Sequence, residues 1–113
     1  MRTLKLLSVL FAFGCHAPFA LADDASVTIS SPADGAKLSR TAQTKINYEV
    51  IPGLKGDHVH LYVDNFKEDA SHQLRGSFTL EALASGKHEI CILIANKGHN
   101  PIGVQKCIKV NVE

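Results

Sequence analysis

The sequence predicts an all-β protein: a single immunoglobulin-like β-sandwich of six to seven strands that follows a cleaved signal peptide. Short stretches of alternating apolar and polar residues are separated by clusters of Gly, Pro, Asn and Asp. No stretch shows helical periodicity of useful length. About 90 residues remain after the leader, which is the size of one such domain.

Residues 1–22 have the order of a secretory signal peptide. Two basic residues, Arg2 and Lys5, come first. An apolar run follows at residues 6–13, and Ala20-Leu21-Ala22 then forms a small-x-small cleavage site. The apolar run is too short to remain as a membrane anchor, so we expect this segment to be removed.

Cleavage after Ala22 would leave residues 23–113 as a mature domain in the periplasm or secreted from the cell. The alternative is processing as a lipoprotein at Cys15, which follows a glycine. Ala12 and Phe13 fit the lipoprotein signal poorly. We therefore expect cleavage at the alanine site.

The mature chain would be close to neutral. The leader contains two of the twelve basic residues and none of the eleven acidic ones, which leaves a net charge of −1. With no basic run, nothing suggests nucleic acid or an anionic membrane surface as a partner. No later stretch approaches the roughly 20 apolar residues of a membrane helix, so no membrane span is predicted.

Three strands are expected in the first half of the mature chain. Residues 27–30 alternate until a run of turn formers at 31–35. Residues 45–51 alternate until Pro52-Gly53. Residues 58–63, with the sequence His-Val-His-Leu-Tyr-Val, form the clearest strand of the chain.

The second half is expected to contain at least three more strands. Residues 65–74 are polar and show no period, so no element is assigned to them. The predicted elements that follow are a strand at 77–81, a tight corner at 83–88, a strand at 89–95, a loop at 96–101 and a strand at 104–112.

Strand parity divides the side chains of these segments between a core face and an outer face. The residues expected to face the core are Ile46, Tyr48, Val50, Val59, Leu61, Val63, Phe78, Leu80, Ile90, Ile92, Ile94, Ile108, Val110 and Val112.

Two of the three cysteines are predicted to form a disulfide. Cys15 would leave with the leader, which leaves Cys91 and Cys107 in an oxidising compartment. Both fall on the outer face of consecutive strands, where parity makes them cross-strand neighbours. A redox role is less expected, because it would more usually show a Cys-x-x-Cys spacing.

The histidines of the mature chain supply the strongest functional signal. His58 and His60 lie side by side on the outer face of one strand, where two imidazoles can bind one metal ion. In immunoglobulin-like topology the loops that carry His72 and His99 reach the same end of the sandwich. Asp57 is a further candidate ligand.

The predicted metal is Cu(II) or Zn(II), because imidazole and carboxylate suit these ions. Sulfur ligands for Cu(I) are missing, since the single Met is in the leader and the cysteines are expected to be paired. His88 is expected instead to bond to the backbone of its own corner, as a tyrosine does in many sandwich domains.

One alternative interpretation stays open. The histidines can be solvated or hydrogen-bonded groups that stabilise loops, in a module that contacts another envelope protein. An enzyme is not expected, because no serine, cysteine or carboxylate-pair constellation is visible.

Three segments resemble an uncharacterised family of small exported bacterial β-sandwich proteins. They are the His-x-His strand at His58–Asp64, the Gly-x-His corner at Leu83–Ile90 and the Asn-x-His-x-Pro type loop at Ala95–Pro101. The resemblance covers most of the chain from Ser31 onward and brings no established activity. It implies that His60, His88 and His99 belong to the family pattern. Lys97-Gly98 loosens the usual spacing before His99, and Val59 stands where some relatives have another histidine.

Overall fold

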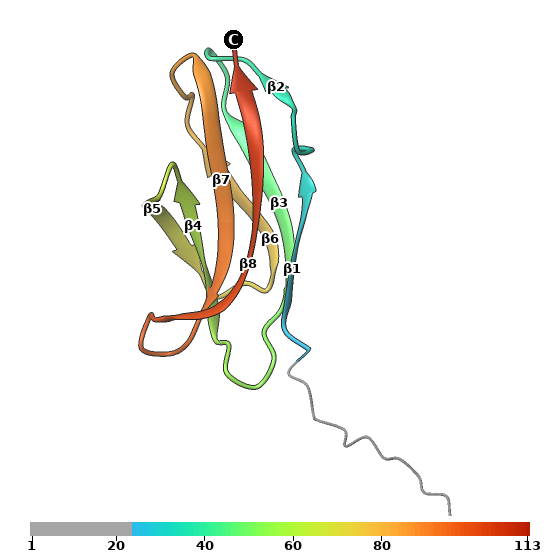
Figure 1. The fold of residues 1–113 in the computed structure, drawn as a ribbon, viewed down its shortest axis with the longest axis vertical. Helices are drawn as coiled ribbons and strands as arrows, with labels where there is room; N and C mark the ends of the chain where they lie inside the picture. Colours follow the sequence, from blue (N-terminus) through green and yellow to red (C-terminus); the bar gives the residue numbers. More distant parts are fainter. Residues whose placement is uncertain (1–23) are drawn as a thin grey trace, which may run out of the picture.

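The computed structural model describes residues 24–113 and confirms the all-β sandwich (Figure 1). Its strands are β1 Ser26–Ser31, β2 Lys37–Leu38, β3 Thr44–Ile51, β4 His58–Val63, β5 Phe66–Ser71, β6 Arg75–Leu80, β7 Gly86–Ala95 and β8 Pro101–Val112. They form a three-stranded sheet, β1-β3-β6, and a five-stranded sheet, β2-β8-β7-β4-β5. The predicted signal peptide and the alternative lipoprotein site at Cys15 lie outside the described residues.

The core lies between the two sheets and matches the prediction from parity. All fourteen residues expected to face inward are at most 7% exposed. The one polar group among them, the hydroxyl of Tyr48, donates a hydrogen bond of 2.8 Å to the carbonyl oxygen of Gln73. Because of this bond, burial of Tyr48 leaves no unpaired polar atom. The Tyr48 ring also stacks on Phe78, with 5.1 Å between ring centroids.

The described part of the chain has eight strands, whereas six or seven were predicted, and two of the eight were not expected. The first is β2, a two-residue strand that runs parallel to the end of β8. The second is β5, which falls within the stretch to which no element was assigned. No helix among residues 24–113 is long and apolar enough to cross a membrane.

The strand β5 follows β4 through a two-residue turn. Asp64 and Asn65 both have positive φ, 51° and 72°, as a type I′ hairpin turn requires. Almost every residue of β5 is exposed, because the strand lies at the edge of its sheet. A strand with neither face buried shows no apolar alternation, but the Asp-Asn pair was a usable turn signal.

The strand β4 lies between β5 and β7 and carries the paired histidines. Its apolar residues face the core, and His58 and His60 face the other way, as parity predicted. The two rings are nevertheless buried, with 1% and 2% of the residues exposed. The predicted outward direction of the two histidines is therefore confirmed, but their burial was not expected.

The β7–β8 hairpin explains this burial. Leu93 pairs with Gln105 and Ala95 with Pro101, so one residue of β7 stands opposite three of β8. Gly103 lies in this bulge with a φ of +90°, a conformation that glycine adopts without strain. The bulge bends β8, and the hairpin swings toward the side of β4 and β5 (Figure 1). Its loop therefore reaches the outer face of β4.

The predicted disulfide is present. Cys91 and Cys107 are direct partners in the register of β7 and β8, and their sulfur atoms are bonded. The bond joins the two strands that carry the hairpin. Disulfides of this kind persist in oxidising compartments, which agrees with an exported protein.

Removing this disulfide should destabilise the fold without removing it. A Cys91→Ser/Cys107→Ser variant is expected to lose about 3 kcal/mol of unfolding free energy, because the unfolded chain regains the entropy of an open loop of about 15 residues. Urea unfolding of the oxidised protein and the variant measures the loss. An unchanged urea midpoint would show that the bond does not restrict the unfolded chain.

The corner before β7 is closed by His88. Its Nδ1–H donates to Oδ2 of Asp64 at 2.6 Å, and its Nε2–H donates to the carbonyl oxygen of Ala84 at 2.7 Å. The other oxygen of Asp64 accepts the backbone N–H of Glu89 at 2.9 Å. Both partners of the ring are acceptors, so the doubly protonated imidazolium fits this position best. The bonds to Asp64 and then Ala84 raise the pKa of His88 above its usual value.

The hydrogen bonds of His88 should make the unfolding free energy fall as the pH rises. The folded-state pKa of His88 is raised, so its contribution is present below about pH 6.5 and is lost as pH rises through the folded value. A His88→Gln variant should show a flatter decline in urea midpoint between pH 6 and pH 9 than the wild type. Equal slopes in the two proteins would contradict this role.

Candidate metal centre

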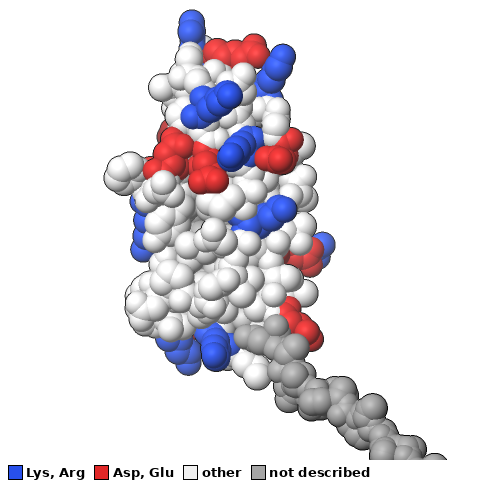
Figure 2. Space-filling model, viewed as in Figure 1, with Lys and Arg blue, Asp and Glu red and all other residues white. Residues whose placement is uncertain are grey.

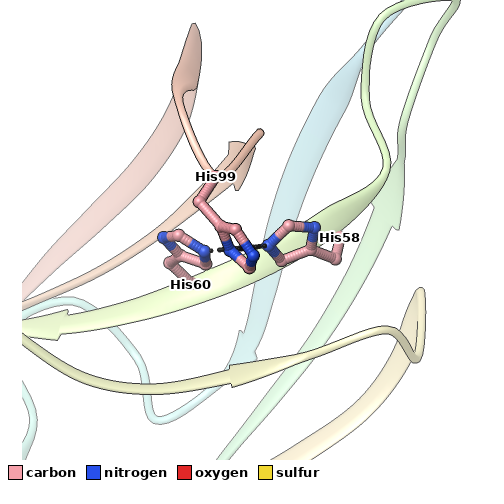
Figure 3. A group of neighbouring side chains, drawn as sticks. All are labelled: His58, His60 and His99. Carbon is pink, nitrogen blue, oxygen red and sulfur yellow. Dashed lines mark hydrogen bonds between the residues drawn. The ribbon is translucent and has the colours of Figure 1, made fainter. Parts of the chain in front are cut away.

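Three imidazoles meet at the end of the sandwich where the β7–β8 hairpin folds over β4 (Figure 3). Nε2 of His58 lies 2.9 Å from Nε2 of His60 and 3.1 Å from Nδ1 of His99. One nitrogen from each ring lies within 4.8 Å of the other two. Nitrogens bound to the same Zn(II) at about 2.0 Å can be at most about 4 Å apart, and the two short distances satisfy this limit.

The strand β4 fixes two of these rings. The core side chains on its inner face set its position, and residues two apart then bring their side chains to the same outer face. On the neighbouring strand β7, Ala95 pairs with His58 and is a small residue with 0% exposure. The partner of His60 on that side is Leu93, which is also buried. The two rings therefore lie against an apolar wall.

The hairpin loop supplies the third ring. Asn96 organises this loop, because its side-chain Oδ1 accepts the backbone N–H groups of Gly98 at 2.9 Å and Asn100 at 3.0 Å. The backbone N–H of His99 donates to the carbonyl oxygen of Asn96 at 2.9 Å. His99 has a φ of +66°, in the left-handed region that His adopts more readily than most residues. The loop therefore aims the ring at β4 through bonds of its own.

Asp57 orients the first ring. Nδ1–H of His58 donates to Oδ2 of Asp57 at 3.0 Å, and the backbone N–H of Asp57 donates to the carbonyl oxygen of Ala95 at 2.8 Å. The bond from His58 is the main reason why the pKa of Asp57 is lowered. A carboxylate that holds one ring nitrogen leaves a lone pair on the other, as in many metal-binding histidines. Here that lone pair points at His60 and His99.

His60 is kept neutral by its surroundings. Burial, together with the smaller effects of the charges of Lys67 and the neighbouring rings, lowers the pKa of His60 to about 4. Nδ1 of His60 is buried with no hydrogen-bond partner. The ring is therefore ready to donate a lone pair at neutral pH, which metal binding requires.

Without an ion, a single nitrogen of His58 serves both of the other rings. Nε2 of His58 can offer only one lone pair or one N–H, and both His60 and His99 lie within hydrogen-bond distance of it. A metal ion would use one lone pair from each ring instead. His99 is exposed while the other two are buried, so solvent can reach the cluster from the loop side and fill a further coordination position.

The structure brings three of the six predicted residues together and places the other three outside that cluster. His58, His60 and His99 form the cluster described above. His72 is not a member of this cluster and lies beside Asp57, with its Nε2 at 3.4 Å from Oδ2 of Asp57. Asp57 contacts the opposite nitrogen of His58. His88 closes the corner that precedes β7.

Sequence reasoning missed Asn96 as the residue that shapes the loop. The signal was present, since Asn side chains often bond to backbone N–H groups a few residues ahead in turns. The left-handed conformation of His99 is a consequence of that loop shape.

Solved structures similar to this chain include domains with an immunoglobulin-like fold. A fibronectin(III)-like module of Clostridium thermocellum CbhA has a TM-score of 0.66 and 15% identity, over 77% of this chain and 96% of that one. The CARDB domain of the PF1109 protein from Pyrococcus furiosus, solved in complex with di-metal ions, has a TM-score of 0.55 and 15% identity, over 79% of this chain and 92% of that one. These matches establish the fold alone. No protein-family model matches the sequence, and no curated protein is significantly similar to it.

Burial of His60 should make the metal-free protein sensitive to acid. The folded-state pKa of about 4 lies below the unfolded value of 6.5, so the unfolded chain takes up the proton first and stability falls as pH drops from 6.5 to 4. At about 1.4 kcal/mol per unit, the loss approaches ~3 kcal/mol. NMR titration of the His60 ring should give a midpoint near pH 4. A midpoint near pH 6.5 would contradict the buried environment.

Proposed function

We propose that this protein is an exported domain that binds a divalent transition metal, Cu(II) or Zn(II), through His58, His60 and His99. Its role would be to buffer or deliver the metal. The observation that carries the proposal is the convergence of three imidazole nitrogens, two of them on buried rings, around one point. Burying polar side chains costs free energy unless they have partners, and a metal ion shared by the three nitrogens would supply one.

The donor set favours these metals. Three neutral imidazoles, without a thiolate or thioether, suit Cu(II) and Zn(II) better than Cu(I), Mg(II) or Ca(II). The hydrogen bond from His58 to Asp57 supports the proposal, because outer carboxylates of this kind fix the ring orientation and raise the basicity of the metal-binding nitrogen.

Export is supported by two features that do not depend on the metal. Residues 1–22 have the composition and order of a signal peptide, and the disulfide suits an oxidising compartment. We also infer membership of the family of small exported β-sandwich proteins with the same three histidine segments. Two of those segments contribute to the cluster, and the third closes the corner at His88.

The test is a calorimetric titration of the protein lacking residues 1–22 with Cu(II) and with Zn(II). We expect binding tighter than about 10 µM for at least one of them. His99→Ala should weaken it at least about tenfold, because one of three ligands is lost. This variant is the sharpest choice, since His99 is exposed on a loop and its removal opens no cavity in the core.

The matched control is His88→Gln, which changes a histidine at the other end of β7. It should leave the affinity unchanged. Binding weaker than about 0.1 mM, or equal affinity in the wild type and His99→Ala, would rule out the proposed site.

A second candidate is a non-catalytic module that contacts another envelope protein. The edge strand β5 favours it, since its backbone is open on one side and Phe66 at its start is 72% exposed. Charges of both signs are interspersed on the face shown in Figure 2, which offers no field of one sign to attract a charged polymer there. In that case the histidines would be structural, and the titration would show no tight binding.

A further inference from the structure

The ring of His58 belongs to two ligand groups. Nε2 faces His60 and His99, as described above. Nδ1 lies 3.0 Å from Oδ2 of Asp57, and Nε2 of His72 lies 3.4 Å from that same oxygen. In this second group, as in the first, one ligand atom from each residue lies within 4.8 Å of the others.

We propose that the protein holds two divalent transition-metal ions, joined by the imidazolate of His58. The first ion would bind Nε2 of His58 with His60 and His99. The second would bind Nδ1 of His58 with Asp57 and His72. This inference rests on the proposed function for its first ion and adds a second site beside it.

The second group has the geometry and chemistry of a ligand set. Oδ2 of Asp57 and Nε2 of His72 are 3.4 Å apart. Two atoms bound to one ion at about 2.0–2.2 Å each can be at most about 4 Å apart, so this pair meets the limit. The rings of His58 and His72 are 4.8 Å apart between centroids, so a small rotation of the exposed His72 side chain can direct its nitrogen at Nδ1. Carboxylate and imidazole are both ordinary ligands of Cu(II) and Zn(II).

Binding of the second ion needs one proton to leave. The N–H bond at Nδ1 of His58 breaks, its electron pair forms the bond to the second ion, and the proton goes to the solvent. No oxidation or reduction is involved. The first ion, bound at Nε2, withdraws charge from the ring and makes that N–H easier to lose. We therefore expect the second ion to bind after the first.

The ligands of the two sites differ in their exposure to solvent. The His58 ring and His60 are buried, whereas the side chain of His72 is 77% exposed and that of Asp57 is 25% exposed. The second site therefore opens to solvent, where an ion can exchange without disturbing the sandwich.

The experiment is a Cu(II) titration of the protein lacking residues 1–22, followed by calorimetry and by electron paramagnetic resonance. We expect two ions per chain in the wild type and one in His72→Ala, with the affinity of the first ion changed by less than about threefold, since its ligands are intact. The matched control is Gln73→Ala, which alters the adjacent exposed residue and leaves its backbone hydrogen bonds in place. It should still bind two ions.

The resonance signal tests the bridge itself. Two Cu(II) ions joined by one imidazolate couple magnetically, so the integrated signal per chain should fall when the second equivalent is added. With one Cu(II) and then one Zn(II), the signal should stay at one spin per chain.

Three results would overturn this inference and leave the first site standing. They are one ion per chain in the wild type, two ions per chain in His72→Ala, and two ions with full uncoupled signal. In the first case Asp57 would only orient His58. Absence of any tight binding would instead overturn the proposed function, on which this inference depends.

Discussion

The division of β4 between two environments is the constraint on which the rest of the structure depends. One face of this strand carries Val59, Leu61 and Val63 into the core, where they are at most 5% exposed. Because side chains alternate strictly, the same burial forces His58 and His60 to the opposite face. Shifting the register by one residue would place two imidazoles in the apolar core, so the packing that stabilises the fold also fixes the position of the two rings.

The second requirement is a cover for that outer face. An immunoglobulin-like sheet usually leaves such positions open to water, but the bulge in β8 bends the hairpin so that His99 closes over β4. The disulfide between Cys91 and Cys107 ties together the strands that lead into this hairpin. The cluster is therefore built from a rigid strand and a loop that local hydrogen bonds hold in shape.

Parity made much of this predictable from the sequence. The core residues, the disulfide and the outward direction of His58 and His60 all follow from period-two alternation, which depends only on neighbours in the chain. The strand β5 could not be found this way, since an edge strand exposed on both faces has no apolar period. Burial of the two histidines was also missed, because it depends on a bulge centred near Gly103, far along the chain, whose geometry no local pattern encodes.

The unequal exposure of the three rings has a consequence for kinetics. An ion at this cluster would be bound by two rings held against an apolar wall and by one ring on a solvent-facing loop. Release would then begin at the loop, where an incoming donor can replace a single ligand before the two fixed ones let go. Such stepwise exchange lets a carrier hold its cargo firmly and still hand it to an acceptor that approaches from that side.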